Sequence, residues 1–197
     1  MNIPNKLTVL RLVMVPVFFI AFCLPQWFGE GASVFSVILM LICYVIAELS
    51  DLLDGKIARK YNLVTDLGKV MDPFADTLSH LTYFACFYGM GIMPAAAFII
   101  IMWREFSISF LRMLMMGKGK AVAANIWGKS KTVLYALVSI LSIAYVVASH
   151  FVPGSWQDIY SLVLTVLFYL AALASLLSFT TYLSAILKSR ALSGMTR

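Results

Sequence analysis

The chain has 197 residues, of which 62% are hydrophobic and only 12% are charged. Soluble globular domains are typically about 45–50% apolar and about 25% charged, so this composition excludes a soluble globular protein and a disordered chain. The net charge is +6. In a membrane protein such an excess of cations indicates orientation and contact with anionic lipid, so we predict no nucleic-acid partner.

Six apolar segments follow one another along the chain, each a candidate for a membrane-spanning helix of about 20 residues. The first begins after a polar start, where Asn5 or Thr8 is the expected helix cap. The six predicted spans are residues 12–24, 33–53, 70–88, 95–116, 132–151 and 159–187. The sequence therefore predicts an all-α integral membrane protein with six transmembrane helices, forming one domain over residues 1–197.

The cations are distributed unevenly between the two sides of these predicted spans. If both termini are cytoplasmic, 13 of the 15 cations fall in inner segments and none falls in an outer loop. This agrees with the positive-inside rule and predicts a multi-pass protein of the cell membrane with both ends in the cytoplasm. The inner cations are Lys6, Arg11, Lys56, Arg59, Lys60, Lys69, Lys118, Lys120, Lys129, Lys131, Lys188, Arg190 and Arg197.

Acidic residues gather around the polar stretch between the second and third spans, residues 54–69. Asp51 and Asp54 are three residues apart, and Asp72 and Asp76 are four apart, so each pair lies on one face of a helix. Two spans joined by a short loop are antiparallel neighbours, which brings the four carboxylates together near the cytoplasmic end. Oxygen ligands suit Mg²⁺ or Mn²⁺, so a metal site is predicted there. The alternative is a set of solvated charges that end two helices.

The complete pattern resembles the signature of the CDP-alcohol phosphatidyltransferase family. It reads Asp51-x2-Asp54-Gly55-x2-Ala58-Arg59-x8-Gly68-x3-Asp72-x3-Asp76, and all eight positions and every spacing match. Residues 2–11, 104–112 and 128–132 are similar to the corresponding segments of bacterial phosphatidylglycerophosphate synthases.

This resemblance implies a six-span CDP-alcohol phosphotransferase fold, a homodimer and a reaction at the cytoplasmic face. CDP-diacylglycerol would donate its phosphatidyl group to the 1-hydroxyl of sn-glycerol-3-phosphate, and CMP would leave. Asp76 matches the general base and, with Asp51, Asp54 and Asp72, the metal ligands. The positions that match the CDP site are Asp51, Gly55, Ala58, Arg59 and Gly68. For the small residues, close helix packing is the alternative interpretation.

The acceptor carries its own phosphate, which requires a basic pocket. We predict that Arg104, Arg112, Lys129 and Lys131 hold it, with Glu105 as a possible partner of the arginines, because an arginine within a span is costly unless it is paired. The lysines could instead be anchors at the inner membrane edge. Arg11 is expected to be an interfacial anchor or to reach a head-group phosphate.

Three residues depart from the pattern or stand beside it. Thr77 follows the last aspartate of the signature, where bacterial synthases commonly have lysine. Glu48 and His80 lie one turn deeper than Asp51 and Asp76 and are predicted to pair across the second and third spans, as a polar floor of the cavity. His80 bonded singly to backbone or water is the alternative.

Two other functions are weighed against this one. The same chemistry could use phosphatidylglycerol (giving cardiolipin), inositol phosphate or serine as the acceptor. The four aspartates could also line a cation path in a small channel or transporter. The path is disfavoured because the outer half of the bilayer has no matching acids and the chain has no internal repeat.

Overall fold

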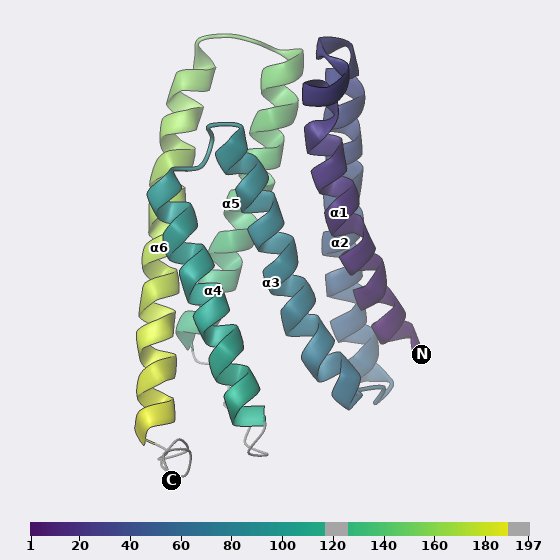
Figure 1. The fold of residues 1–197 in the computed structure, drawn as a ribbon, viewed down its shortest axis with the longest axis vertical. Coiled ribbons are helices and arrows are strands. Elements are labelled where there is room, and N and C mark those ends of the chain that lie inside the picture. Colours follow the sequence, from purple (N-terminus) through teal and green to yellow (C-terminus); the bar gives the residue numbers. More distant parts are fainter. Residues whose placement is uncertain (117–125, 189–197) are drawn as a thin grey trace. The chain divides into compact units, whose positions relative to one another are not determined.

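The computed structural model describes residues 1–116 and 126–188, except for the side chains of residues 116, 126–130, 185 and 188. The described chain is helical and contains no strand. Its helices (Figure 1) are α1 (Ile3–Phe28), the short 3₁₀ turn η1 (Glu30–Ala32), α2 (Ser33–Lys60), α3 (Asp66–Gly89), α4 (Ala95–Met116), α5 (Ile126–Phe151) and α6 (Trp156–Lys188).

These helices belong to two compact units. The first unit comprises Met1–Phe87 and Ser142–Asp158, and the second comprises Tyr88–Leu141 and Ile159–Arg197. In the first unit α1 and α2 pack along each other, and a short connection joins α2 to α3 (Figure 1). All the acids of the signature lie in the first unit, and Arg104, Glu105 and Lys131 lie in the second.

The first helix begins earlier than the apolar pattern predicts, and its cap is a different residue. The side chain of Asn2 accepts a hydrogen bond from the backbone N–H of Asn5 at 3.1 Å, and Pro4 lies in the first turn, where proline is tolerated. The prediction of Asn5 or Thr8 as the cap is therefore wrong. The helix ends at Phe28, and its C-cap is Gly29, whose φ of 82° favours glycine.

The signature residues lie on two long helices rather than on a loop. Helix α2 continues seven residues past the end of the predicted span, which leaves a turn at 61–65 before α3. Thr65 Oγ1 accepts the N–H of Gly68 at 3.0 Å and so caps α3. Pro73 lies inside α3.

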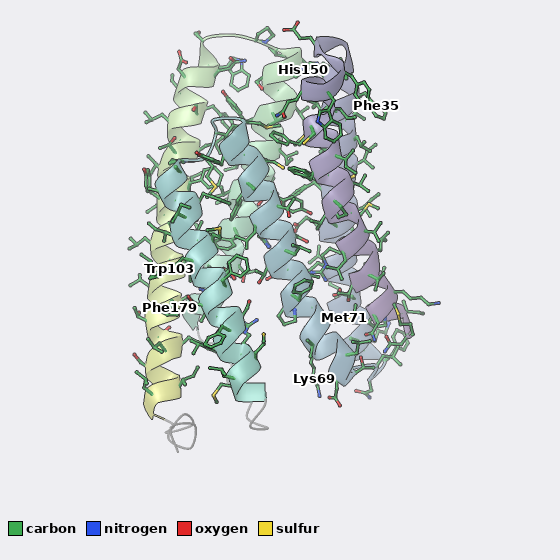
Figure 2. The ribbon with its side chains drawn as sticks, in the orientation of Figure 1. Phe35, Lys69, Met71, Trp103, His150 and Phe179 are labelled. Atoms are coloured by element: carbon green, nitrogen blue, oxygen red, sulfur yellow. The ribbon has the colours of Figure 1, made fainter. Side chains whose placement is uncertain are left out.

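Four of the described helical segments are long and apolar enough to cross a membrane: Ile3–Phe28, Glu30–Lys60, Lys131–Phe151 and Trp156–Ser184. Helices α3 and α4 lie outside this set; α3 carries Asp72 and Asp76 of the signature, and α4 carries the buried Arg104 and Glu105. Large apolar side chains such as Phe35 and Trp103 stand exposed on α2 and α4, 61% and 74% accessible (Figure 2). A water-facing surface rarely carries so many such residues, so the chain is a membrane protein.

Aromatic packing holds the three helices of the signature together. The ring of Tyr83 on α3 lies 4.7 Å from that of Phe18 on α1 and 5.3 Å from that of Tyr44 on α2, measured between centroids. All three residues are buried, so α1, α2 and α3 share one core. This core fixes the positions of the polar side chains that lie nearer the N-terminus of α1.

Candidate active site

Arg11 on α1 lies between two carboxylates of the signature. Its guanidinium is ion-paired with the carboxylate of Asp51, and its Nη2 lies 2.6 Å from Oδ2 of Asp54. The Arg11 and Asp54 side chains are only 3% and 5% exposed, whereas that of Asp51 is 49% exposed. The expectation of an interfacial anchor is therefore wrong. The buried carboxylate of Asp54 requires a counter-charge, and α1 supplies it through Arg11, which also pairs with the more exposed Asp51.

Thr8, one turn before Arg11, connects the acids of α2 to those of α3. Its hydroxyl oxygen lies 2.8 Å from Oδ1 of Asp72 and 3.3 Å from Oδ2 of Asp54. The residue is fully buried. Because a hydroxyl carries one proton, it donates to one of these carboxylates at a time. Two carboxylates from different helices thus lie within hydrogen-bond distance of one atom.

Asp76 lies one turn beyond Asp72 and has a partner on its own helix. Its Oδ1 is 3.2 Å from Nδ1 of His80, and the same ring nitrogen is 2.9 Å from the Asp76 carbonyl oxygen. Asp76 also interacts electrostatically with Asp51 and Glu48 across α2 and α3. Glu48 and His80 interact electrostatically as well, but their direct pairing stays a prediction.

The chemistry of these side chains fits a hard divalent cation. The four aspartates offer only oxygen ligands, and Arg11 already brings positive charge to two of them. Within residues 1–116 and 126–188, no three or more His, Cys, Asp or Glu side chains lie close enough together to hold a metal ion. The oxygen ligands therefore suit a hard divalent cation. In the described arrangement, however, these acids contact Arg11, Thr8 and His80.

Gly68 marks a close approach between α3 and α1. A Cβ atom at this position would lie 3.1 Å from Oδ1 of Asn5 and 3.2 Å from Oγ1 of Thr65. Those two side chains are hydrogen-bonded to each other at 3.2 Å. Packing therefore accounts for this glycine, and its predicted part in CDP binding stays a prediction.

The other small residues of the signature lie on the last turns of α2. A Cβ atom on Gly55 would lie 3.5 Å from Nη2 of Arg59, so the guanidinium folds back over the glycine. Arg59 is exposed, and Ala58 is half-buried. An exposed guanidinium beside a glycine is free to approach a phosphate.

The second unit contains a separate buried charge cluster. Arg104 Nη1 lies 3.0 Å and 3.1 Å from the two carboxylate oxygens of Glu105, and Lys131 Nζ lies 2.7 Å from Oε1 of that residue. The Tyr135 hydroxyl donates to the same Oε1 at 3.1 Å, and Arg104 Nη2 donates to the Ser178 hydroxyl at 2.8 Å. Both cations predicted here for the acceptor phosphate are thus held by one carboxylate.

The remaining two cations of that predicted pocket are not brought to this cluster by the described residues. Arg112 is exposed, whereas Arg104 is buried. Eight residues along an α-helix rotate the side chain about 80° away from the starting direction, so the two arginines do not share a face. The side chain of Lys129 lies outside the described residues.

The sequence reasoning overlooked the contribution of α1 to this site. The polar residues Asn2, Asn5, Thr8 and Arg11 recur every three residues, so each lies next to the following one in a row that winds around the start of α1. Asn2 donates to the Leu63 carbonyl oxygen at 2.7 Å, so the row is tied to the turn before α3 as well as to the acids. That spacing, ahead of an apolar run, is the signal that could have found it.

The sequence of this chain is similar to those of known proteins. The family model for CDP-alcohol phosphatidyltransferase matches residues 1–178. A *Treponema pallidum* protein named CDP-diacylglycerol--glycerol-3-phosphate 3-phosphatidyltransferase is 32% identical over 194 residues, covering 93% of this chain and 88% of the relative. A *Bacillus subtilis* protein of the same name is 38% identical over 136 residues, covering 66% and 70%.

A *Mycobacterium tuberculosis* relative, named as a probable phosphatidylglycerophosphate synthase, is 32% identical over 136 residues and is covered over 63% of its length. The family match spans most of the chain, including the α2–α3 pair that carries the aspartates and the α1 row that contacts them. On this basis the chain belongs to the CDP-alcohol phosphatidyltransferase family.

Proposed function

We propose that the protein transfers the phosphatidyl group of CDP-diacylglycerol to the 1-hydroxyl of sn-glycerol-3-phosphate, giving phosphatidylglycerophosphate and CMP. The observation that carries this proposal is the complete aspartate signature on α2 and α3, in a chain whose relatives bear the name of that activity. The donor is a lipid and the acceptor is soluble, which suits a site near the polar end of a membrane bundle.

In the reaction, the acceptor hydroxyl oxygen forms a bond to the phosphorus that bears the diacylglycerol. The bond from that phosphorus to the bridging oxygen of CMP breaks, and CMP leaves with the electron pair. We assign Asp76 as the base that takes the hydroxyl proton, because its side chain is 38% exposed and so can be reached by a soluble acceptor. His80, bonded to Asp76, orients that carboxylate.

Members of this family generally depend on a divalent metal. We propose Mg²⁺ or Mn²⁺, held by Asp51, Asp54, Asp72 and Asp76, and a bound cation would stabilise negative charge on the pyrophosphate. Gly55, Ala58, Arg59 and Gly68 line the CDP site in this proposal. Arg59 is the member best suited to neutralise a phosphate oxygen, since its guanidinium is exposed.

For the acceptor phosphate we propose Arg104 and Lys131, joined by Arg112 and Lys129. Two buried cations share one carboxylate at Glu105, so the cluster retains a positive charge that favours an anion. We further propose six membrane spans, cytoplasmic termini with the active site at that face, and a homodimer. The positive-inside distribution of the cations supports the orientation.

The test is an acceptor panel. Purified full-length protein in detergent receives CDP-diacylglycerol, Mg²⁺ or Mn²⁺, and one of glycerol-3-phosphate, phosphatidylglycerol, inositol phosphate or serine, and CMP release is followed. We expect release with glycerol-3-phosphate. Release of CMP with another alcohol but not with glycerol-3-phosphate would refute the acceptor assignment. Cation uptake into liposomes that contain the protein, in the absence of CDP-diacylglycerol, would favour a channel.

A single substitution tests the assigned base. Asp76→Asn should abolish turnover while leaving CDP binding largely intact, because the amide cannot take the proton. Wild-type turnover in this variant would refute the assignment.

A further inference from the structure

Arg11 is a single buried cation placed on two of the acids that the proposed function gives to a metal. Its guanidinium contacts Asp51 and, at 2.6 Å, Asp54, and its side chain is 3% exposed. We propose that Arg11 is the resident counter-ion of Asp51 and Asp54, and that a divalent cation binds by displacing its guanidinium from these carboxylates. The inference rests on the proposed metal site.

The two cations compete because both need the same carboxylates. Arg11 uses Oδ1 of Asp51 and Oδ2 of Asp54, so each acid already has an oxygen committed to the guanidinium. A divalent ion bound to the same two groups would lie a few ångströms from the buried Arg11 guanidinium, and the two positive charges would repel each other. Metal binding therefore requires the guanidinium to move away from at least one carboxylate.

The surroundings keep Arg11 in place when metal is absent. The aromatic core of Phe18, Tyr44 and Tyr83 fixes α1 against α2 and α3, and Thr8 holds Asp54 and Asp72 one turn away. The Asp54 carboxylate, 5% exposed, would be costly to bury without a cation, so the Arg11 guanidinium stabilises the metal-free fold. Arg11 is thus a positioning residue: it fixes the carboxylates of Asp51 and Asp54 in the metal-free protein and competes with the metal ion for them.

Removal of the charge should therefore change metal affinity and metal-free stability in opposite directions. Arg11→Met keeps much of the length of the side chain but removes its charge. We expect the variant to bind Mn²⁺ at least about tenfold more tightly than wild type. In EDTA its melting temperature should be lower, and saturating Mn²⁺ should raise that temperature more than it does in wild type. Mn²⁺ binding is read from the loss of the free-ion electron paramagnetic resonance signal, without substrate.

Lys69→Met is the matched control. It removes one positive charge near the start of α3, where Figure 2 labels Lys69, from an exposed pair with Asp66 at 2.8 Å. The Lys69 ammonium lowers the pKa of Asp66, but the pair takes no part in the buried contacts. We expect wild-type Mn²⁺ affinity in this variant. Equal tightening in Lys69→Met would mean that net charge alone acts, and would overturn the proposal.

The outcomes separate this inference from the proposed function. If wild type binds no Mn²⁺, or Asp54→Asn binds it as well as wild type does, the proposed metal site fails. If wild type binds Mn²⁺ and Arg11→Met binds it equally or more weakly, only the Arg11 proposal fails. If Arg11→Met does not fold, Arg11→Lys takes its place, since lysine lacks the planar fork that spans both carboxylates. Tighter Mn²⁺ binding by that variant supports displacement, and unchanged or weaker binding overturns it.

Discussion

Glu105 holds together the buried charges of the second unit, and its neutralisation should destabilise the protein strongly. The substitution Glu105→Gln preserves the shape of the side chain but removes its negative charge. Arg104 and Lys131, 7% exposed each, would then remain buried with no carboxylate between them. The Tyr135 hydroxyl would keep an acceptor in the amide oxygen.

The size of this destabilisation is set by the buried positive charges of Arg104 and Lys131, which remain after the substitution. Breaking a buried ion pair by removing one partner typically costs about 3–5 kcal/mol, because an uncompensated charge stays buried. For a chain of this size each kcal/mol lowers the melting temperature by about 2–4 °C, so we expect a fall of about 6–20 °C. Lys131→Gln added to Glu105→Gln removes one of the two orphaned cations. The double variant should lose less than the sum of the single losses.

Thermal unfolding of the purified protein in detergent, followed by tryptophan fluorescence, measures these differences. Asp66→Asn is the control, because Asp66 pairs with Lys69 on the surface and its loss should leave the melting temperature unchanged. A Glu105→Gln melting temperature within error of wild type would refute the reasoning. Strict additivity in the double variant would mean that Lys131 and Glu105 are not coupled.

Two further predictions concern the contact between α1 and the turn before α3. Gly68→Ala places a Cβ atom 3.1–3.2 Å from two side-chain oxygens, so it should destabilise the protein by about 1–3 kcal/mol in thermal melts. Adding Asn5→Ala should recover part of that loss, and no recovery would mean that the clash lies elsewhere. Asn2→Ala loses both the cap of α1 and the bond to the Leu63 carbonyl, and should cost about 1–2 kcal/mol. Asn2→Asp keeps the side-chain oxygen that caps α1 but loses the N–H that donates to the Leu63 carbonyl. If this variant is as unstable as Asn2→Ala, the whole loss of stability comes from the bond to Leu63.

The grouping of the aspartates could be predicted from sequence because helical periodicity is local. Spacings of three and four residues place Asp51 with Asp54 and Asp72 with Asp76, and the short connection makes their helices neighbours. The structure brings Asp54 and Asp72 within hydrogen-bond distance of Thr8, but no three of the acids in the described residues lie close enough together to hold a metal ion, so the metal site formed by all four stays a prediction. Which partner each acid takes could not be predicted in this way, because Thr8 and Arg11 are more than 40 residues distant along the chain.

Helix boundaries were harder to predict for a related reason. Apolar composition marks where a segment can cross a membrane, but a helix continues as long as its backbone bonds and caps allow. The polar composition after residue 53 therefore predicts a connection, whereas α2 continues to Lys60. In the second unit, the pairing of Arg104 with a carboxylate was foreseen from the cost of an unpaired arginine. The convergence of Lys131 and Tyr135 on that carboxylate was not, because it depends on how α4 and α5 pack.

The row of Asn2, Asn5, Thr8 and Arg11 also bears on the order in which the protein is made. The hydrogen-bond partners of these residues on α2, on α3 and in the turn between them lie 43–64 residues later in the chain. At a synthesis rate of about 5–20 residues per second, α1 exists for several seconds before its counter-charges emerge from the ribosome. During that interval Arg11 lacks the carboxylates of Asp51 and Asp54, so we expect it to stay close to water or to lipid phosphate. The polar core of the first unit therefore forms late, when α2 and α3 have been synthesised and Arg11 can pair with Asp51 and Asp54.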